Sequence, residues 1–140
     1  MGGKILPGIP PVGRFCGMGN KMTKINRRSV GAQREQQAAE YLRAKGYEIL
    51  AQNIYTPFGE LDILAGQGDM LIFTEIKYRS GMQCGDPLEA VDRRKQKRIC
   101  QSAMYYYAQH GYGKPCRFDV IAIYGDGRIV HIENAFEYQF

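Results

Sequence analysis

The sequence lacks several features that would assign the protein to a membrane or to a disulfide-bonded class. It has no apolar run long enough to span a bilayer, and the N-terminal residues lack the apolar core of a signal peptide. The four cysteines include no Cys-x-x-Cys pair and no histidine at the spacing of a zinc site. We therefore expect a cytoplasmic protein with reduced thiols and no structural zinc.

Acidic residues are absent from the first 28 residues, which carry six basic residues and many glycines and prolines. Because this stretch shows no hydrophobic periodicity, we predict a disordered basic tail over residues 1–28. Such a tail either adds non-specific affinity for phosphates or is inert. Residues 29–140, the expected domain, hold 13 basic and 14 acidic residues. Any binding of nucleic acid must therefore come from local clusters of charge rather than from net charge.

Helical patterns occupy two stretches of the domain. Residues 29–45 begin with Ser29 as a cap and end at Gly46 as a stop. Glu35 lies on the inward stripe of this helix, so it is either an ion-paired boundary glutamate or an acid of an inner site. A second helix is expected over residues 87–109, after a glycine-rich loop over 80–86.

Alternating apolar and polar residues predict five strands. They cover residues 47–52, 59–64, 71–79, 116–124 and 128–133. The resulting order is helix, three strands, helix and two strands. This order indicates an α/β fold in which a mixed β-sheet is flanked by helices.

Charged side chains converge on the second and third of these strands, which a turn at residues 66–69 would join as a hairpin. Asp62 lies on the polar face of the second strand, and Glu75 and Lys77 share a face of the third. Two carboxylates beside an ammonium group suit Mg²⁺, which prefers oxygen ligands. The alternative is an exposed hairpin that carries a Glu75–Lys77 ion pair.

The second helix is basic at its start. Lys95 shares a face with Val91 and Ile99, so we expect it near the carboxylates, in contact with phosphate or carboxylate. Arg94 and Arg98 belong to the other faces and are expected to bind phosphates, although a basic cluster is often only a solvated face.

Three polar residues of the C-terminal part have a mainly structural interpretation. Asp119 is surrounded by apolar residues, so we expect it to pair with Arg117 or another base, and only secondarily to belong to a site. His110 and His131 have no partner at metal-ligand spacing and are expected to pack or to face solvent.

Several short blocks of the sequence together resemble a known family. These blocks are Gly31-x-x-x-Glu35-x-x-Ala38, Gly59-Glu60-Leu61-Asp62, Phe73-Thr74-Glu75-Ile76-Lys77-Tyr78-Arg79, Lys95 and Arg117-Phe118-Asp119-Val120. With them the chain resembles, from about Ser29 to its end, the bacterial UPF0102 family, also called YraN, and more distantly the PD-(D/E)xK nuclease superfamily. Leu61 stands where the superfamily pattern has proline.

This resemblance implies a restriction-endonuclease-like core and a metal-dependent endonuclease activity on DNA, with branched or structured DNA included. Asp62 and Glu75 would hold one or two Mg²⁺ or Mn²⁺ ions, and Lys77 would orient or activate water. Glu35 would act as an auxiliary acid. Nucleic-acid contacts are expected from Lys95, Arg79, Arg94 and Arg98.

A non-catalytic module on the same fold, binding nucleic acid or another protein, is the alternative function. The expected partner is DNA or another nucleic acid rather than a membrane. The sequence is also compatible with a homodimer.

Overall fold

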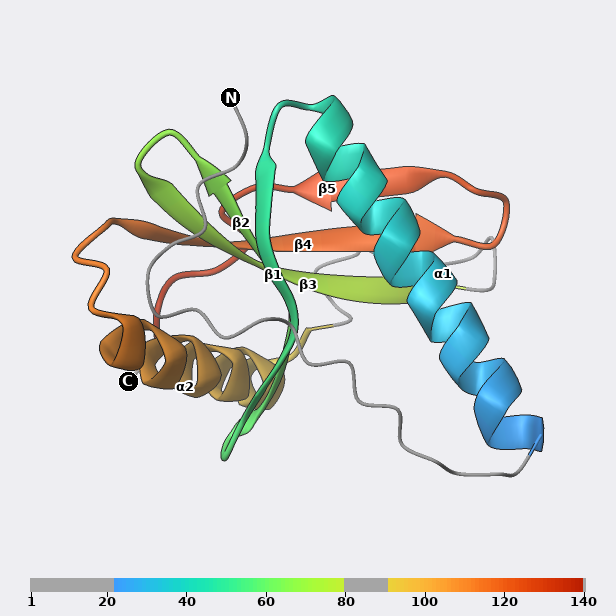
Figure 1. Cartoon of the computed structure of the whole chain (residues 1–140), viewed down its shortest axis with the longest axis horizontal. Coiled ribbons are helices and arrows are strands. Elements are labelled where there is room, and N and C mark those ends of the chain that lie inside the picture. Colours follow the sequence, from blue (N-terminus) through green and yellow to red (C-terminus); the bar gives the residue numbers. More distant parts are fainter. Residues whose placement is uncertain (1–21, 80–90, 140) are drawn as a thin grey trace.

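The computed structural model describes residues 22–79 and 91–139, and the side chains of these residues from Gly31 onward. The sheet and the two helices are shown in Figure 1. In chain order the elements are α1 (Met22–Ala44), β1 (Glu48–Thr56), β2 (Gly59–Gln67), β3 (Met70–Arg79), α2 (Arg93–His110), β4 (Cys116–Tyr124) and β5 (Ile129–Ile132).

The strands form one five-stranded mixed sheet in the order β1-β2-β3-β4-β5. β1–β2, β2–β3 and β4–β5 are antiparallel neighbours, whereas β3 and β4 are parallel. A parallel pair needs a crossover connection, and α2 lies within it. The order and the fold class predicted from sequence are confirmed, including the helix-flanked mixed sheet expected of a restriction-endonuclease-like core.

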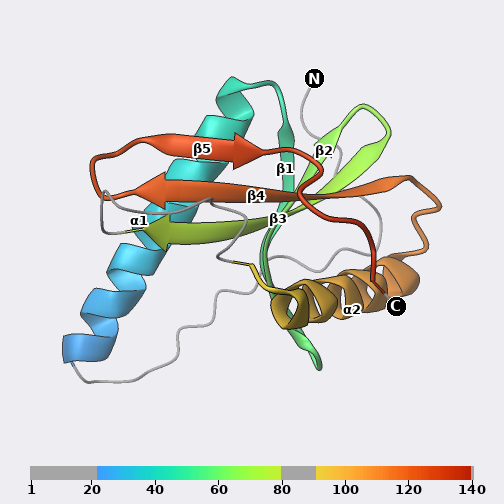
Figure 2. The same ribbon diagram turned by 180° about the vertical axis from the view of Figure 1, so that it is seen from behind.

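The two helices pack on opposite faces of the sheet, and each face has its own apolar cluster. Figure 1 shows α1 in front of the sheet, and Figure 2, seen from behind, shows it beyond the strands. Ala38, Ala39 and Leu42 of α1 pack with Ile63 and Ile121. On the other face Ile99, Cys100, Ala103 and Tyr106 of α2 join a cluster that contains Leu64, Phe73, Phe118 and Val120.

Both helices begin at positions other than those predicted. α1 starts at Met22 rather than at Ser29, so residues 22–28 of the expected tail are helical, and residues 1–21 lie outside the described residues. α2 starts at Arg93 rather than near residue 87. The Asp92 side chain accepts a hydrogen bond from the amide of Lys95 (2.9 Å) and caps the helix there. The expected glycine-rich loop over residues 80–86 lies outside the described residues.

The strands agree more closely with expectation. β4 has the predicted bounds, and the predicted β2–β3 hairpin turns at Gly68 and Asp69. β1 continues through residues expected to form a loop, as far as Thr56. Within the described parts of the chain, no helix combines the length and the apolar composition needed to cross a bilayer.

Candidate metal centre and basic helix

Asp62 lies at the point where β2 separates from β3. The paired residues of the two strands run from Gln67–Met70 to Ile63–Thr74, and the pairing stops there. Beyond that point Asp62 Oδ2 accepts a hydrogen bond from the backbone amide of Ile76 (2.9 Å). The side chain thus occupies the gap in which the next backbone pair of the ladder would have formed.

Glu75 lies beside this gap, buried on β3, and is surrounded by two ammonium groups. Its Oε1 lies 3.7 Å from Lys77 Nζ on the same strand and 3.4 Å from Lys95 Nζ on α2. The Glu75 carboxyl group also hydrogen-bonds to Asp62. The structure therefore brings Asp62, Glu75, Lys77 and Lys95 together from three elements.

The two buried carboxyl groups bind protons more tightly than ordinary ones. Burial raises the pKa of Glu75 to about 7, the charge of Asp62 adds to the rise, and Lys95 and Lys77 oppose it. Burial likewise raises the pKa of Asp62, against the hydrogen bonds from Ile76 and Glu75. Two neighbouring carboxylates without a cation between them resist ionising together.

Glu35 and Glu60 bring two further carboxylates to Asp62. One oxygen from each of the three residues lies within 4.8 Å of the others. Loss of solvent raises the pKa of Glu35 and that of Glu60, and the charge of Asp62 raises both further. A hydrogen bond from Asn53 opposes the rise at Glu35.

This donor set fits a hard divalent cation. Two oxygens bound to one Mg²⁺ at about 2.1 Å lie at most about 4.2 Å apart, so small side-chain movements would bring the three carboxylates onto one ion. A cation would also relieve the repulsion that raises their pKa values. The expected pair, Asp62 and Glu75, and the group of Glu35, Glu60 and Asp62 have Asp62 in common.

Glu60 is the site residue that sequence reasoning missed as a candidate ligand. It precedes Asp62 by two positions on one strand, and this alternation already indicated that the two share a face. Asn53 was also missed. It has a left-handed backbone (φ +52°) in the middle of β1, and local sequence gave no sign of this conformation.

The predicted nucleic-acid contacts lie at different distances from the carboxylates. Lys95 contacts Glu75, as described above. Arg94 and Arg98 are exposed on the same helix. Arg79 follows Lys77 by two residues at the end of β3, and within the described parts of the chain its buried Nε has no hydrogen-bond partner.

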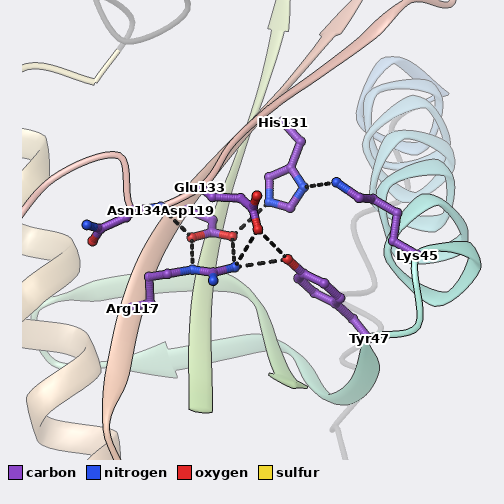
Figure 3. Close-up of polar contacts among 7 residues, drawn as sticks. All are labelled: Lys45, Tyr47, Arg117, Asp119, His131, Glu133 and Asn134. Carbon is purple, nitrogen blue, oxygen red and sulfur yellow. Dashed lines mark hydrogen bonds and ion pairs between the residues drawn. The ribbon is translucent and has the colours of Figure 1, made fainter. Parts of the chain in front are cut away.

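A second polar cluster occupies the α1 side of the sheet, and Asp119 is at its centre (Figure 3). Arg117 donates two hydrogen bonds to this carboxylate (2.8 and 2.9 Å), His131 Nε2 lies 2.7 Å from it, and the amide of Asn134 donates a fourth bond (3.0 Å). The expected pairing of Asp119 with Arg117 is confirmed.

The outer part of this cluster connects it to the short link between α1 and β1. Arg117 also donates to the hydroxyl of Tyr47 (2.9 Å) and to Glu133 (3.3 Å). Lys45 Nζ lies 3.5 Å from His131 Nδ1. Because an ammonium group can only donate, Nδ1 accepts, and the Nε2 proton is directed to Asp119. His131 is packed, as expected, and holds two segments together.

An apolar pocket beside α2 is separate from these polar groups. A pocket of about 300 Å³ lies between the second half of α2 and the C-terminal segment. Its lining, which includes Phe73, Met104, Phe118 and Phe136, contains none of the clustered carboxylates. We therefore take the point where β2 separates from β3 as the candidate functional site.

The fold and this site define an α/β protein with a mixed sheet between two helices and an acidic centre bordered by lysines. The model of the "Uncharacterised protein family UPF0102" matches residues 34–123. The chain belongs to this family, as the sequence blocks predicted.

Relatives from several bacteria cover most of the chain. A UPF0102 protein of Thermodesulfovibrio yellowstonii is 44% identical over 107 residues, which are 76% of this chain and 95% of the relative. One of Symbiobacterium thermophilum is 45% identical over 114 residues, 78% of this chain and 97% of the relative. One of Shewanella loihica is 40% identical over 115 residues, which are 82% of this chain and 100% of the relative.

Proposed function

We propose that this protein is a metal-dependent nuclease that hydrolyses phosphodiester bonds of DNA, with branched or structured DNA among its substrates. The observation that supports the proposal is the gathering of four carboxylates and two lysines where β2 separates from β3. Carboxylates suit a hard cation, and ammonium groups beside them suit an anionic substrate. A cytoplasmic location belongs to the same proposal and agrees with the free thiols of Cys100 and Cys116.

Each side chain would have a distinct role in this reaction. Asp62 and Glu75 would hold one or two ions, with Glu35 and Glu60 completing the oxygen ligands. When bound, Mg²⁺ or Mn²⁺ lowers the pKa of water and offsets charge on phosphate. Lys77 would orient the attacking water or stabilise charge, and Lys95 would contact the phosphate.

A cleavage screen in Mn²⁺ over linear, flapped, branched and single-stranded DNA tests the proposal, combined with calorimetry of Mn²⁺ binding. Asp62→Asn should lose metal binding and cleavage together, because a neutral amide replaces an anionic ligand. Lys77→Met should lose cleavage and keep most of the metal affinity. Arg93→Gln, which removes one exposed charge of α2, is the control and should cleave like the parent.

Two results would count against the proposed roles. If Lys77→Met cleaves as fast as the parent, Lys77 has no part in the chemistry. If the parent binds no metal and cleaves none of the substrates, a non-catalytic module becomes the better description.

A further inference from the structure

We propose that the tip of the β1–β2 hairpin is a base-stacking platform, on which the ring of Phe58 receives an unpaired base of the DNA. The phosphates of the same strand would follow α2 towards the carboxylates. This inference rests on the proposed function and narrows its substrate to DNA with unpaired bases beside the cleaved bond.

The Phe58 ring is both exposed and held in place. It lies in the turn between β1 and β2, with 45% of its surface exposed. The ring makes a T-shaped contact with Tyr105 of α2, with the ring centroids 6.1 Å apart and the planes at 67°. An aromatic ring fixed from one side and open to solvent can stack on a base without first being ordered.

The backbone of the turn is fixed by Thr56. Its hydroxyl oxygen accepts a hydrogen bond from the amide of Phe58 (3.1 Å) and lies 2.9 Å from the carbonyl oxygen of Gly59. The same oxygen is hydrogen-bonded to Ser102 Oγ on α2 (2.9 Å). Gly59 has φ +148°, which favours glycine at this position. These contacts hold the hairpin tip against α2. Both ribbon views show the hairpin running past this helix (Figures 1 and 2).

A stripe of positive charge leads away from the platform along α2. Arg94, Arg98 and Tyr105 are spaced by four and seven residues, so they share one side of the helix. Both arginines are exposed. Lys95 and Ser102, also seven residues apart, form the adjoining stripe. These arginines would attract the DNA phosphates electrostatically, which an aromatic stacking surface alone cannot do.

The separation between platform and site matches a short stretch of DNA. Lys95 and Ser102 are seven helical residues apart, about 10 Å along the axis at 1.5 Å per residue. Gly59 and Asp62 are three strand residues apart, again about 10 Å. Phosphates of a stacked strand are 3.4 Å apart along its axis, so about three nucleotides separate the stacked base from the bond at Asp62.

Tyr55 places a second ring beside the acidic group. It pairs directly with Glu60 across the hairpin, so the two side chains share a face, and it is 65% exposed. Exposed rings therefore lie on the tip both next to α2 and next to the carboxylates.

The absence of tryptophan from the chain allows a direct test. Phe58→Trp introduces a single indole at the platform. Met104→Trp is the control and introduces one on a different side of α2, at a position with a similar exposure, 44% in the parent. The probe is an oligothymidylate about 15 nucleotides long, enough to cover one binding site, titrated without metal so that no cleavage occurs. We expect its binding to quench the fluorescence of Phe58→Trp and to leave that of Met104→Trp nearly unchanged.

The companion measurement is affinity by fluorescence anisotropy. Phe58→Ala should weaken binding of the oligothymidylate by about five- to 150-fold, the effect of losing one stacked base. Affinity for a blunt duplex should change by less than about twofold, because its bases are already stacked. Equal quenching in both tryptophan variants, unchanged affinity of Phe58→Ala, or no binding of the single strand by the parent would each overturn the platform.

These measurements separate the platform from the proposed chemistry. Stacking is read without metal, whereas hydrolysis is read from cleavage and from Asp62→Asn. Quenching of Phe58→Trp without cleavage by the parent would support the base-stacking platform and contradict the proposed nuclease activity. Metal-dependent cleavage with no quenching of Phe58→Trp and no loss of affinity in Phe58→Ala would support the nuclease activity and contradict the platform.

Discussion

Asp119 is completely buried and ionised, and its loss should be the most damaging polar substitution in the second cluster. Asp119→Asn removes the charge opposite Arg117 and leaves that guanidinium half-satisfied in a poorly solvated place. We expect the free energy of unfolding in urea to fall by about 3–5 kcal/mol. Glu133→Gln removes another partner of Arg117 that is half exposed, and should cost about 1 kcal/mol or less. Equal losses of unfolding free energy in the two variants would contradict the expectation that the buried ion pair contributes more than the exposed one.

The same residue predicts a dependence on pH. Burial alone would raise the pKa of Asp119, but hydrogen bonds from His131, Arg117 and the Asn134 amide hold it below its ordinary value of 3.8. Its stabilising contribution is therefore complete above that value and is lost as pH falls through the folded-state pKa. The stability difference between parent and Asp119→Asn should stay level near neutral pH and shrink below about pH 4. A difference that widened in acid would refute this account.

Asn53 offers a test of backbone conformation. Its positive φ is tolerated by asparagine and glycine but not by a β-branched residue. Asn53→Val should lower the free energy of unfolding by about 1–3 kcal/mol, whereas Asn53→Gly should stay within about 1 kcal/mol of the parent. If the two variants lose equal stability, the side-chain bond to Glu35 rather than the backbone decides the outcome.

At the scale of single elements, α2 carries two stripes of equal charge that can be compared. Arg94→Gln with Arg98→Gln removes two charges from the side that holds Tyr105, and Arg93→Gln with Lys97→Gln removes two from the side that holds Met104. For single-stranded DNA, the first pair should reduce the slope of log affinity against log salt by about 1.4, at 0.7 for each phosphate contact. The second pair should change the slope little. Anisotropy titrations at several salt concentrations give both slopes. Equal reductions would mean that both sides of α2 contact DNA phosphates to the same extent.

Element types followed from the sequence more reliably than element starts. The bounds of β4 were predicted to the residue, and apolar clusters cover both faces of that strand. The start of α2 was misplaced because Asp92, rather than an earlier residue, satisfies the first amides of the helix. β1 was cut short because Asn53 read as loop, although the strand continues beyond its left-handed turn.

For the whole molecule, the arrangement of layers predicts where amide hydrogens exchange slowly. β3 and β4 lie inside the sheet with apolar clusters on both faces, whereas β5 and the hairpin tip lie at its margins. Native-state hydrogen exchange should therefore find the highest protection in β3 and β4 and much lower protection at Tyr55 and Phe58. Uniform protection across the sheet would contradict this expectation.

The site could be predicted only as far as neighbouring segments determine it. Asp62 and Glu75 were recognisable because one short turn joins their strands. Lys95 followed from helical spacing. The contact of His131 with Asp119, and the approach of Glu35 to Asp62, depend on how whole layers pack, which no local pattern records.

The single parallel pair in the sheet also has a consequence for the order of folding. β2 and β3 are joined by a tight turn, so their pairing closes a short loop and can form early. Leu71 of β3 meets Cys116 of β4 only after the connection containing α2 has been laid down, and closing that long loop is slower. During this interval Asp62 and Glu75 are already neighbours while Lys95 is still absent. If these carboxylates bind the divalent cation proposed above, adding the cation during refolding should accelerate the pairing of β2 with β3, and a chelator should remove that acceleration.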